Sequence, residues 1–297
     1  MSAGTSIEQL QEELERLRSQ LQKSEQLLKE QHYLPRPDHY ALHSLLLISD
    51  SALPLGSFAY SSGLESYVAH HRPLPPSQTP LSSFREFLSL SIASLAGTTL
   101  PYLLHAHRHP DELADLDDEF DASTLCTVAR RASLAQGLAL INVWERSFRS
   151  SFSNAFAHSQ EKCGDNELRS LAHESLAAFS TALRRAQFGS QGDAKVNGHL
   201  APLWGVFSVA MGIDVEQSAY VFMLNHAKAV LSAAVRASIM GPYQAQAFLA
   251  SQELQVLITE RMREHWDTAT EDAGQVIPVM DLWVGRHELL YSRIFNS

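Results

Sequence analysis

Apolar residues recur at helical spacing along most of this chain. From Asp38 onward, long stretches rich in Ala, Leu, Ser, Glu and Arg repeat with a period of about 3.6 residues. No alternating β-branched runs flank an Asn-Gly-type turn, and Asn197-Gly198 suits a helix start because Pro202 follows. The pattern predicts an all-α fold with helices at His39–Ser49, Tyr60–His71, Leu81–Ala106, Ser123–Ser150, Glu167–Arg185, Pro202–Met211, Val215–Ile239 and Tyr243–Trp266.

A narrower apolar pattern precedes this region. Seven positions alternate at spacings of three and four, as the a and d positions of a heptad do: Ile7, Leu10, Leu14, Leu17, Leu21, Ser24 and Leu28. Ser6 with Gln9 can form a capping box at the start, and Pro35 and Pro37 end the helix. The helix is either a solvated extension or a self-association or partner helix. We expect residues 1–37 to form this coiled-coil-like helix and its proline linker.

The remaining residues, 38–297, read as a single helical-bundle domain. Asp214 with Gln217 predicts a capping box, and Gly241-Pro242 marks a helix stop followed by a restart. The pattern breaks again between Thr268 and Pro278. The tail that follows, within residues 268–297, is apolar and carries arginines. Because the segment before it is expected to be a flexible connection, the tail is a candidate for folding when it binds a partner.

Composition excludes several classes of protein. The 297 residues are 45% hydrophobic, with a formal charge of −10 that argues against a nucleic-acid binder. No apolar run approaches the roughly 20 residues of a membrane span, and no secretory signal is recognisable at the start. The two cysteines, Cys126 and Cys163, suit a reducing cytosol better than an oxidising compartment. A cytoplasmic location is therefore expected.

Part of the negative charge lies in one run, Asp111–Asp121. Blocks of like charge usually stay in water, so the run is predicted to be a solvated insert between helices. A metal-collecting loop is the alternative, although the spacing does not match an EF-hand.

Fourteen histidines raise the question of a metal site. His105 and His109 share a helix face, while His107 between them points elsewhere. No His-Glu-x-x-His motif occurs, so incidental surface histidines are the better interpretation. We assign no metal ligand.

Signatures of catalysis are missing as well. The chain has no G-x-S-x-G elbow, Walker lysine motif or dinucleotide fingerprint. Ser57 and Ser61 lie near Glu65, but no histidine is placed by sequence to activate them. The two cysteines read as small buried or loop residues rather than nucleophiles. The chain is predicted not to be an enzyme.

The most particular stretch runs from Leu45 to Tyr67. Pro54 and Gly56 can hold a tight loop conformation, because proline restricts its own φ and glycine admits angles that other residues avoid. Small residues around Tyr60 and Gly63 would let another backbone come close. Most joints between helices need nothing so specific.

This combination resembles the N-terminal signature of the urease accessory protein F (UreF) family. Arg130–Gly137 is similar to the family's mid-chain helix with its Gln-Gly step, and Gly198–Gly205 to its Gly-His-x-x-Pro segment. Tyr220–Ala234 and the terminal Ser292–Ser297 also resemble family segments. Together they cover most of residues 38–297, whereas the N-terminal helix and the acidic run look like local additions.

The resemblance implies an all-α chaperone of urease maturation without catalytic activity of its own. Members bridge a second accessory protein, called D or H, and a nickel-carrying GTPase, called G, and the assembly activates apo-urease. They also form homodimers. No stably bound cofactor is expected, since nickel is handled by the assembly. We expect partner contacts at Pro54, Gly56, Ser57, Tyr60, Ser61, Gly63, Glu65, Gly198, His199, Pro202, Arg236, His287, Arg293 and Phe295.

Simpler interpretations of these segments stay open. Gly198–Gly205 could only cap and pack a helix, and Arg236 could only satisfy carbonyls at a helix end. Arg293 beside Phe295 offers planar hydrogen bonding next to an apolar anchor, a pairing common at interface hot spots. Two other functions remain: a helical protein that binds metal through its own histidines, and a general coiled-coil scaffold unrelated to urease.

Overall fold

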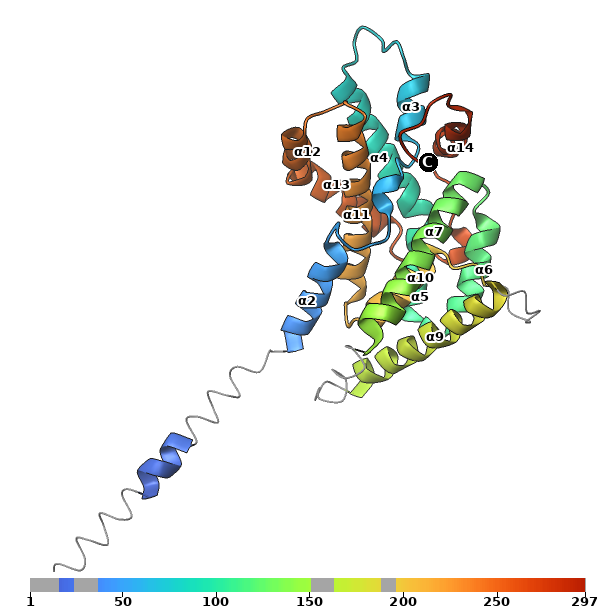
Figure 1. Cartoon of the computed structure of the whole chain (residues 1–297). Helices are drawn as coiled ribbons and strands as arrows, with labels where there is room; N and C mark the ends of the chain where they lie inside the picture. The colour runs from blue at the N-terminus through green and yellow to red at the C-terminus, as the bar shows by residue number, and fades with distance from the viewer. Residues whose placement is uncertain (1–15, 24–36, 151–162, 188–195, 297) are drawn as a thin grey trace, which may run out of the picture. The chain divides into compact units, whose positions relative to one another are not determined.

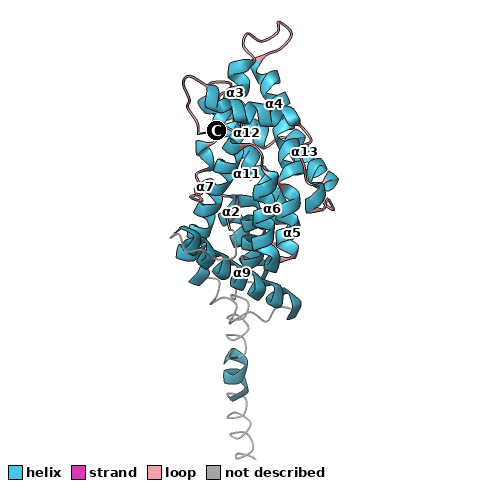
Figure 2. Ribbon diagram, turned by 90° about the vertical axis from the view of Figure 1, so that its right-hand side faces the viewer, coloured by secondary structure: helices cyan, strands magenta, loops and turns pink. Residues whose placement is uncertain are grey.

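The structure is a computed structural model that describes residues 16–23, 37–150, 163–187 and 196–296. These residues form helices, turns and loops, and none of them forms a strand (Figure 2). The prediction of an all-α fold is confirmed. Contacts divide the chain into two units, Met1–Leu42 and His43–Ser297.

The first unit contains a helix over residues 16–23, whose side chains are all exposed. Leu17 and Leu21 are the heptad positions within it. The other five heptad positions, and the capping box expected at Ser6, lie outside the described residues.

The rest of the described chain is a succession of helices (Figure 1). Five of the expected helices have a single counterpart each, and the largest differences are at the starts of α3, which begins at Leu64 rather than Tyr60, and α9, which begins at Cys163 rather than Glu167. In chain order the α-helices are α2 (Pro37–Ser49), α3 (Leu64–His70), α4 (Pro80–Thr98), α5 (Leu100–Arg108), α6 (Leu113–Ser123), α7 (Thr127–Val143), α9 (Cys163–Gln187), α10 (Leu200–Ala210), α11 (Val215–Arg236), α12 (Pro242–Leu249), α13 (Gln252–Glu264) and α14 (Pro278–Arg286).

Short helical turns link several of these elements. A π-helical turn, η3 (Trp144–Phe148), continues α7, and the other turns are 3-10 helices. These are η1 (Ser57–Ala59), η2 (Pro110–Glu112), η4 (Thr270–Asp272) and η5 (His287–Leu289).

Two helices that the pattern predicts as continuous are broken. The span predicted at Leu81–Ala106 bends by 40° between α4 and α5. Pro101 falls in the first turn of α5, where its missing N–H is not needed. The span predicted at Tyr243–Trp266 is divided at Ser251, whose side chain accepts a hydrogen bond from the Leu254 amide and starts α13. Side-chain capping decided this second break.

The acidic run is not a solvated insert. It forms η2 and α6, and Leu113, Leu116 and Phe120 of α6 are buried in the core. Their spacing of three and four residues places them on one face, while the exposed carboxylates occupy the opposite face. The prediction is therefore wrong, because the apolar residues of the run form a continuous helix face that packs into the core.

Helix α10 lies at the centre of the domain. Every residue from Ala201 to Ala210 is buried, and α10 contacts α5, α7, α9, α6 and α11. The core is continuous and extends from Ile48 in α2 to Phe295 near the chain end. A helix that is apolar on all sides is stable only inside such a shell.

No single described helix is long and apolar enough to cross a membrane. The bent pair α4 and α5 reaches the length and apolar character of a membrane span only when the two helices are taken together.

Glycine at position 205 allows α10 and α5 to approach closely. A Cβ atom there would lie 2.5 Å from the Leu103 carbonyl oxygen and 2.9 Å from the His107 amide nitrogen. Backbone atoms cannot move aside as the end of a flexible side chain can. The contact therefore requires glycine.

Replacing Gly205 by alanine is expected to lower the free energy of unfolding by about 1–3 kcal/mol, the usual cost of overpacking a core. Denaturant titration followed by circular dichroism measures it. The matched control is Gly274→Ala, since a Cβ at Gly274 has nothing within 4 Å. Equal stability of Gly205→Ala and the parent chain would contradict the close approach.

Candidate partner-binding site

The loop before α3 is held from both sides. The Ser57 hydroxyl donates to Gln136 Oε1 on α7 at 2.9 Å. Gly63 has a φ of 85°, and a Cβ there would lie 3.0 Å from a Val284 methyl and 3.1 Å from the Val284 amide nitrogen. The expected close approach of a second backbone is thus confirmed, and that backbone is α14 of the same chain.

Glu65 binds the C-terminal tail to the first turn of α3. Its carboxylate accepts hydrogen bonds from the Ile294 amide at 2.7 Å, the Phe295 amide at 3.2 Å and His287 Nε2 at 3.0 Å. The Asn296 amide donates to the Ala59 carbonyl at 2.8 Å. One carboxylate therefore organises three groups of the tail.

Arg236 supports the same tail from α11. Its guanidinium carbon lies 4.3 Å from the centre of the Phe295 ring, a cation–π arrangement. The guanidinium also donates to the Phe58 carbonyl, which joins the tail to the loop. Arg236 thus does more than satisfy carbonyls at its own helix end, although it also donates to Ser232.

The outer side of this junction carries exposed apolar side chains next to ion pairs. Arg293 donates to Glu288 at 2.8 Å, and Arg131 donates to the other oxygen of the same carboxylate. These two arginines, Arg131 first, lower the pKa of Glu288. We call this surface the tail face and define it by the exposed side chains of Phe58, Leu289, Tyr291, Arg293 and Ile294.

The expectation of a loosely tethered tail is wrong. Met280 and Trp283 of α14 pack in the core, His287 is completely buried and only 4% of the Phe295 side chain is exposed. α14 lies beside α3 near the chain end (Figure 1). Phe295 therefore anchors the tail to its own domain, and the exposed apolar groups are its neighbours in sequence.

Gly198, His199 and Pro202 are buried away from the surface. The carboxylate of Asp117, completely buried, accepts hydrogen bonds from the backbone amides of Asn197 at 2.6 Å, Gly198 at 3.0 Å and His199 at 2.7 Å. These amides have no helical partners, because they precede α10. The packing interpretation of this segment is the one that the geometry supports.

The His199 ring extends the network. Its Nε2 donates to Asp121 Oδ1 at 2.9 Å, and its Nδ1 lies 3.0 Å from Ser133 Oγ. Arg130 also donates to Asp121. Arg130 first, and His199 after it, lower the pKa of Asp121. Two carboxylates of the acidic run thus hold the start of α10.

The three histidines around α5 do not converge. The rings of His105 and His109 lie 4.9 Å apart, whereas His107 is buried and its Nε2 donates to the Ile213 carbonyl at 2.9 Å. Burial lowers the pKa of His107. Within the described parts of the chain, no group of three His, Cys, Asp or Glu side chains could hold a metal ion.

A cavity of about 820 Å³ lies behind the loop. Its wall includes Pro54, Tyr60, Cys126, Trp204 and Lys228, from segments far apart in the sequence. His226 faces this space, and its Nε2 lies 2.8 Å from Ser91 Oγ. Burial lowers the pKa of His226 to about 4. The histidine is therefore neutral near pH 7.

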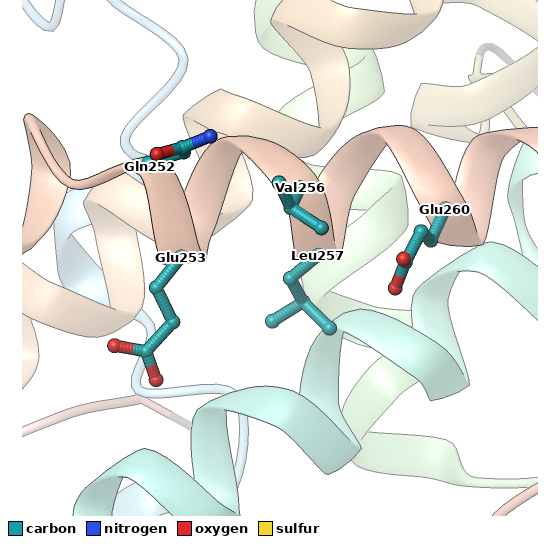
Figure 3. Close-up of a pocket in the computed structure, with 5 residues that line it drawn as sticks. All are labelled: Gln252, Glu253, Val256, Leu257 and Glu260. Atoms are coloured by element: carbon teal, nitrogen blue, oxygen red, sulfur yellow. The ribbon is translucent and has the colours of Figure 1, made fainter.

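A second hollow lies along the surface of α13 and is lined by Gln252, Glu253, Val256, Leu257 and Glu260 (Figure 3). All five belong to α13, so this is a shallow hollow along one face of a single helix. It is not a pocket formed where several elements meet. None of the residues expected from the sequence to bind a partner lies there.

Comparison with known proteins decides the family. The UreF family model matches residues 81–253, more than half of the chain. The chain belongs to the UreF family. The resemblance found in the sequence is confirmed, and the coarse function follows: this is a urease accessory protein.

Relatives occur in fungi, plants and bacteria. An "Uncharacterized urease accessory protein UreF-like" of Schizosaccharomyces pombe is 34% identical over 255 residues, which cover 86% of this chain and 97% of the relative. Urease accessory protein F of Arabidopsis thaliana is 30% identical, over 84% and 89% of the two chains. UreF of Paenarthrobacter aurescens is 26% identical, over 86% and 97%.

Sequence reasoning missed four residues that hold this UreF domain together. Asp117 and Asp121 belong to the acidic run, and Arg130 and Arg131 were noted only as part of a resemblance. The alternation of Leu113, Leu116 and Phe120 with the acids was the available signal, since it predicts a helix with one carboxylate, Asp117, on the buried side.

Asp117→Ala is expected to lower the free energy of unfolding by about 3 kcal/mol or more, since three backbone amides, those of Gly198 and His199 buried, lose their acceptor. Thermal and denaturant unfolding measure the loss. Glu119→Ala removes an exposed acid from the same helix and should change stability by about 0.5 kcal/mol or less. Similar losses in the two variants would refute the anchoring role of Asp117.

His226 makes stability depend on pH. The unfolded chain binds a proton below about pH 6.5, whereas the folded chain does so only near pH 4. The free energy of unfolding should therefore fall as the pH drops from 6.5 to 4, by up to roughly 3 kcal/mol from this group. His226→Gln should flatten that slope in denaturant titrations at several pH values. A slope that His226→Gln leaves intact would exclude this origin.

Proposed function

We propose that this UreF protein is a scaffold that joins accessory protein D/H to the nickel-carrying GTPase G during nickel insertion into apo-urease. Membership of the family supports a role in urease maturation. The observation that carries the finer proposal is the tail face, where exposed apolar side chains lie on a rigidly supported backbone. D/H is the partner that we assign to this surface.

The composition of the tail face suits a protein partner. Tyr291 is fully exposed, and Phe58, Leu289 and Ile294 expose more than half of their side chains. Arg293 lies among them, and Tyr and Arg are enriched in the residues that dominate interface energies. Arg293 also forms an ion pair with Glu288, and polar groups of this kind are typical of the rim of an interface.

The backbone beneath these side chains is already ordered. Glu65 holds the amides of Ile294 and Phe295, and the buried Phe295 ring and His287 fix the two ends of the segment. Because the tail is ordered before a partner binds, little binding free energy is spent on ordering it. The residues named from the sequence thus divide into supports, such as Glu65 and the buried His287, and exposed contacts, such as Arg293.

In this proposal the chain acts by bringing proteins together, without a catalytic step of its own. Nickel is the cargo of the assembly, carried by GTPase G, and we assign it no ligand in this chain. We further propose that the protein works in the cytoplasm as a homodimer. In this proposal the loop before α3 lies behind the docking surface and supports the tail. Its residues are Pro54, Gly56, Ser57, Tyr60, Ser61 and Gly63.

Tyr291→Ala combined with Ile294→Ala is expected to weaken binding of D/H at least tenfold, because both exposed side chains supply apolar contact area on the tail face. Calorimetry or biolayer interferometry with purified D/H measures the change. Helicity and thermal stability should stay close to those of the parent chain, because both side chains are exposed. Phe295→Ala is unsuitable here, since it removes a core residue.

The matched control is Tyr243→Ala on α12, which removes another exposed tyrosine. It should leave D/H affinity unchanged. Equal affinity of the double variant and the parent chain would remove the tail face from the interface. If the intact chain co-purified with neither D/H nor G, the scaffold proposal itself would fail.

A further inference from the structure

The cavity behind the loop lies where three helices present small side chains to the same space. Within α4, α7 and α11 the lining residues recur at helical spacing, so each set occupies one face of its helix. Core-facing positions in a helical bundle usually carry larger apolar side chains that fill such space. The small or polar residues found there instead are Ser91, Ser94 and Thr98 of α4, Ala129, Ala132 and Ser133 of α7, and Asn225, Ala229 and Ser232 of α11.

The cavity has a buried floor and an exposed rim. Trp204 and Phe222 are buried, whereas Phe58 and Leu125 are exposed, and all four line the same space. The volume of about 820 Å³ lies within the range of about 300–1,000 Å³ that is usual for pockets that bind organic molecules. A small apolar molecule can therefore enter at the rim and bury most of its surface against the floor.

Lys228 gives the wall a positive charge. It is the one Lys or Arg among the described residues that line the cavity, and it is half-buried. Its ammonium donates to the Ser49 carbonyl at 2.6 Å. An ammonium has three N–H donors, and Lys228 makes no other hydrogen bond and no ion pair with the described residues. Two donors are thus left for a negatively charged group.

The two acids of the lining do not neutralise this ammonium by direct contact. Asp50 and Asp281 are both exposed, and each accepts a hydrogen bond close to itself in sequence, Asp50 from the Ala52 amide and Asp281 from Gln275. Burial lowers the pKa of Lys228, while Asp50 acts in the opposite direction. The acids therefore lie at the rim, and the cation lies deeper.

The remaining polar groups leave the wall uncharged around Lys228. His226 is neutral near pH 7 and its Nε2 is paired with Ser91, while Ser94 donates to Gln275 at 2.8 Å. A metal ion does not suit this wall, because Lys228 repels cations and the described residues provide no group of three metal-ligating side chains. The wall suits a molecule with one negative group and an apolar body.

We propose that this cavity binds a free aliphatic monocarboxylate. Its carboxylate accepts hydrogen bonds from the Lys228 ammonium, and its hydrocarbon chain lies along the small residues of α4, α7 and α11 toward Trp204 and Phe222. This binding site goes beyond the role in urease maturation and does not depend on D/H or G.

Calorimetry with the full-length chain at pH 7 tests the recognition of the carboxylate, with decanoate and 1-decanol as the two probes. Decanoate is expected to bind with one molecule per chain and at least about fivefold more tightly than 1-decanol, because hydrogen bonds between charged groups are stronger than neutral ones. Lys228→Met keeps a side chain of similar length without the charge and should remove the difference. Lys228→Arg, the matched control, should keep it.

Two results of this titration would overturn the proposal. The first is that the parent chain binds no decanoate up to about 1 mM, a very weak affinity. The second is that decanoate and 1-decanol bind equally well, since the site then recognises only an apolar body.

Filling the cavity tests where decanoate binds. Ala132→Leu combined with Ala229→Leu places larger side chains in the open space and should abolish decanoate binding. Thermal stability should not fall, since the added methyl groups enter a void rather than a packed core. Ala178→Leu, at an exposed position of α9, is the matched control and should leave binding unchanged.

Decanoate binding that survives in the filled variant would overturn the assignment to this cavity. Lys228→Met adds no branch to the core, so it tests the site even if the two leucines disturb packing. The affinity for D/H is measured without decanoate, so this proposal and the scaffold proposal fail separately.

Discussion

Burial of α10 is the constraint on which the rest of the domain depends. Its residues from Ala201 to Ala210 are all buried, so neighbouring helices must cover every side of it. Gly205 allows α5 to lie directly against its backbone. The backbone amides before its first turn must also find partners inside the protein, since a buried amide without an acceptor costs a large part of the stability of a domain.

Asp117 meets that requirement, and it explains why an acidic segment belongs to the core. The Asp117 carboxylate accepts hydrogen bonds from three backbone amides. Asp121 accepts another from the ring of His199, the last of these three residues. The exposed acids of α6 keep that helix soluble on its outer side, and Leu113, Leu116 and Phe120 fix its inner side. A block of negative charge thus combines a solvated face with a buried anchor.

A single carboxylate has a similar role at the tail. Glu65 accepts hydrogen bonds from two backbone amides of the tail and from the His287 ring. The Arg236 guanidinium lies over the Phe295 ring. These contacts join α3, α11 and the end of the chain into one surface, although the three are far apart in sequence. Because hydrogen bonds to Glu65 and burial of the Phe295 ring fix the backbone, the surface presents its apolar groups in a defined arrangement, as a docking site for a structured partner requires.

The helical class, most of the helices and the family follow from the amino-acid sequence, because the 3.6-residue apolar period and the signature residues are local properties of the chain. It also indicated that a backbone would approach Gly63. The three-dimensional fold was needed to show that this backbone belongs to α14, that Phe295 is an internal anchor and that Asp117 accepts a hydrogen bond from the amide of His199. A carboxylate or an aromatic ring has the same local sequence signal whether it faces water, a partner or its own core. The choice depends on which distant amides and rings folding brings within a few ångströms, and spacing along the chain does not encode those distances.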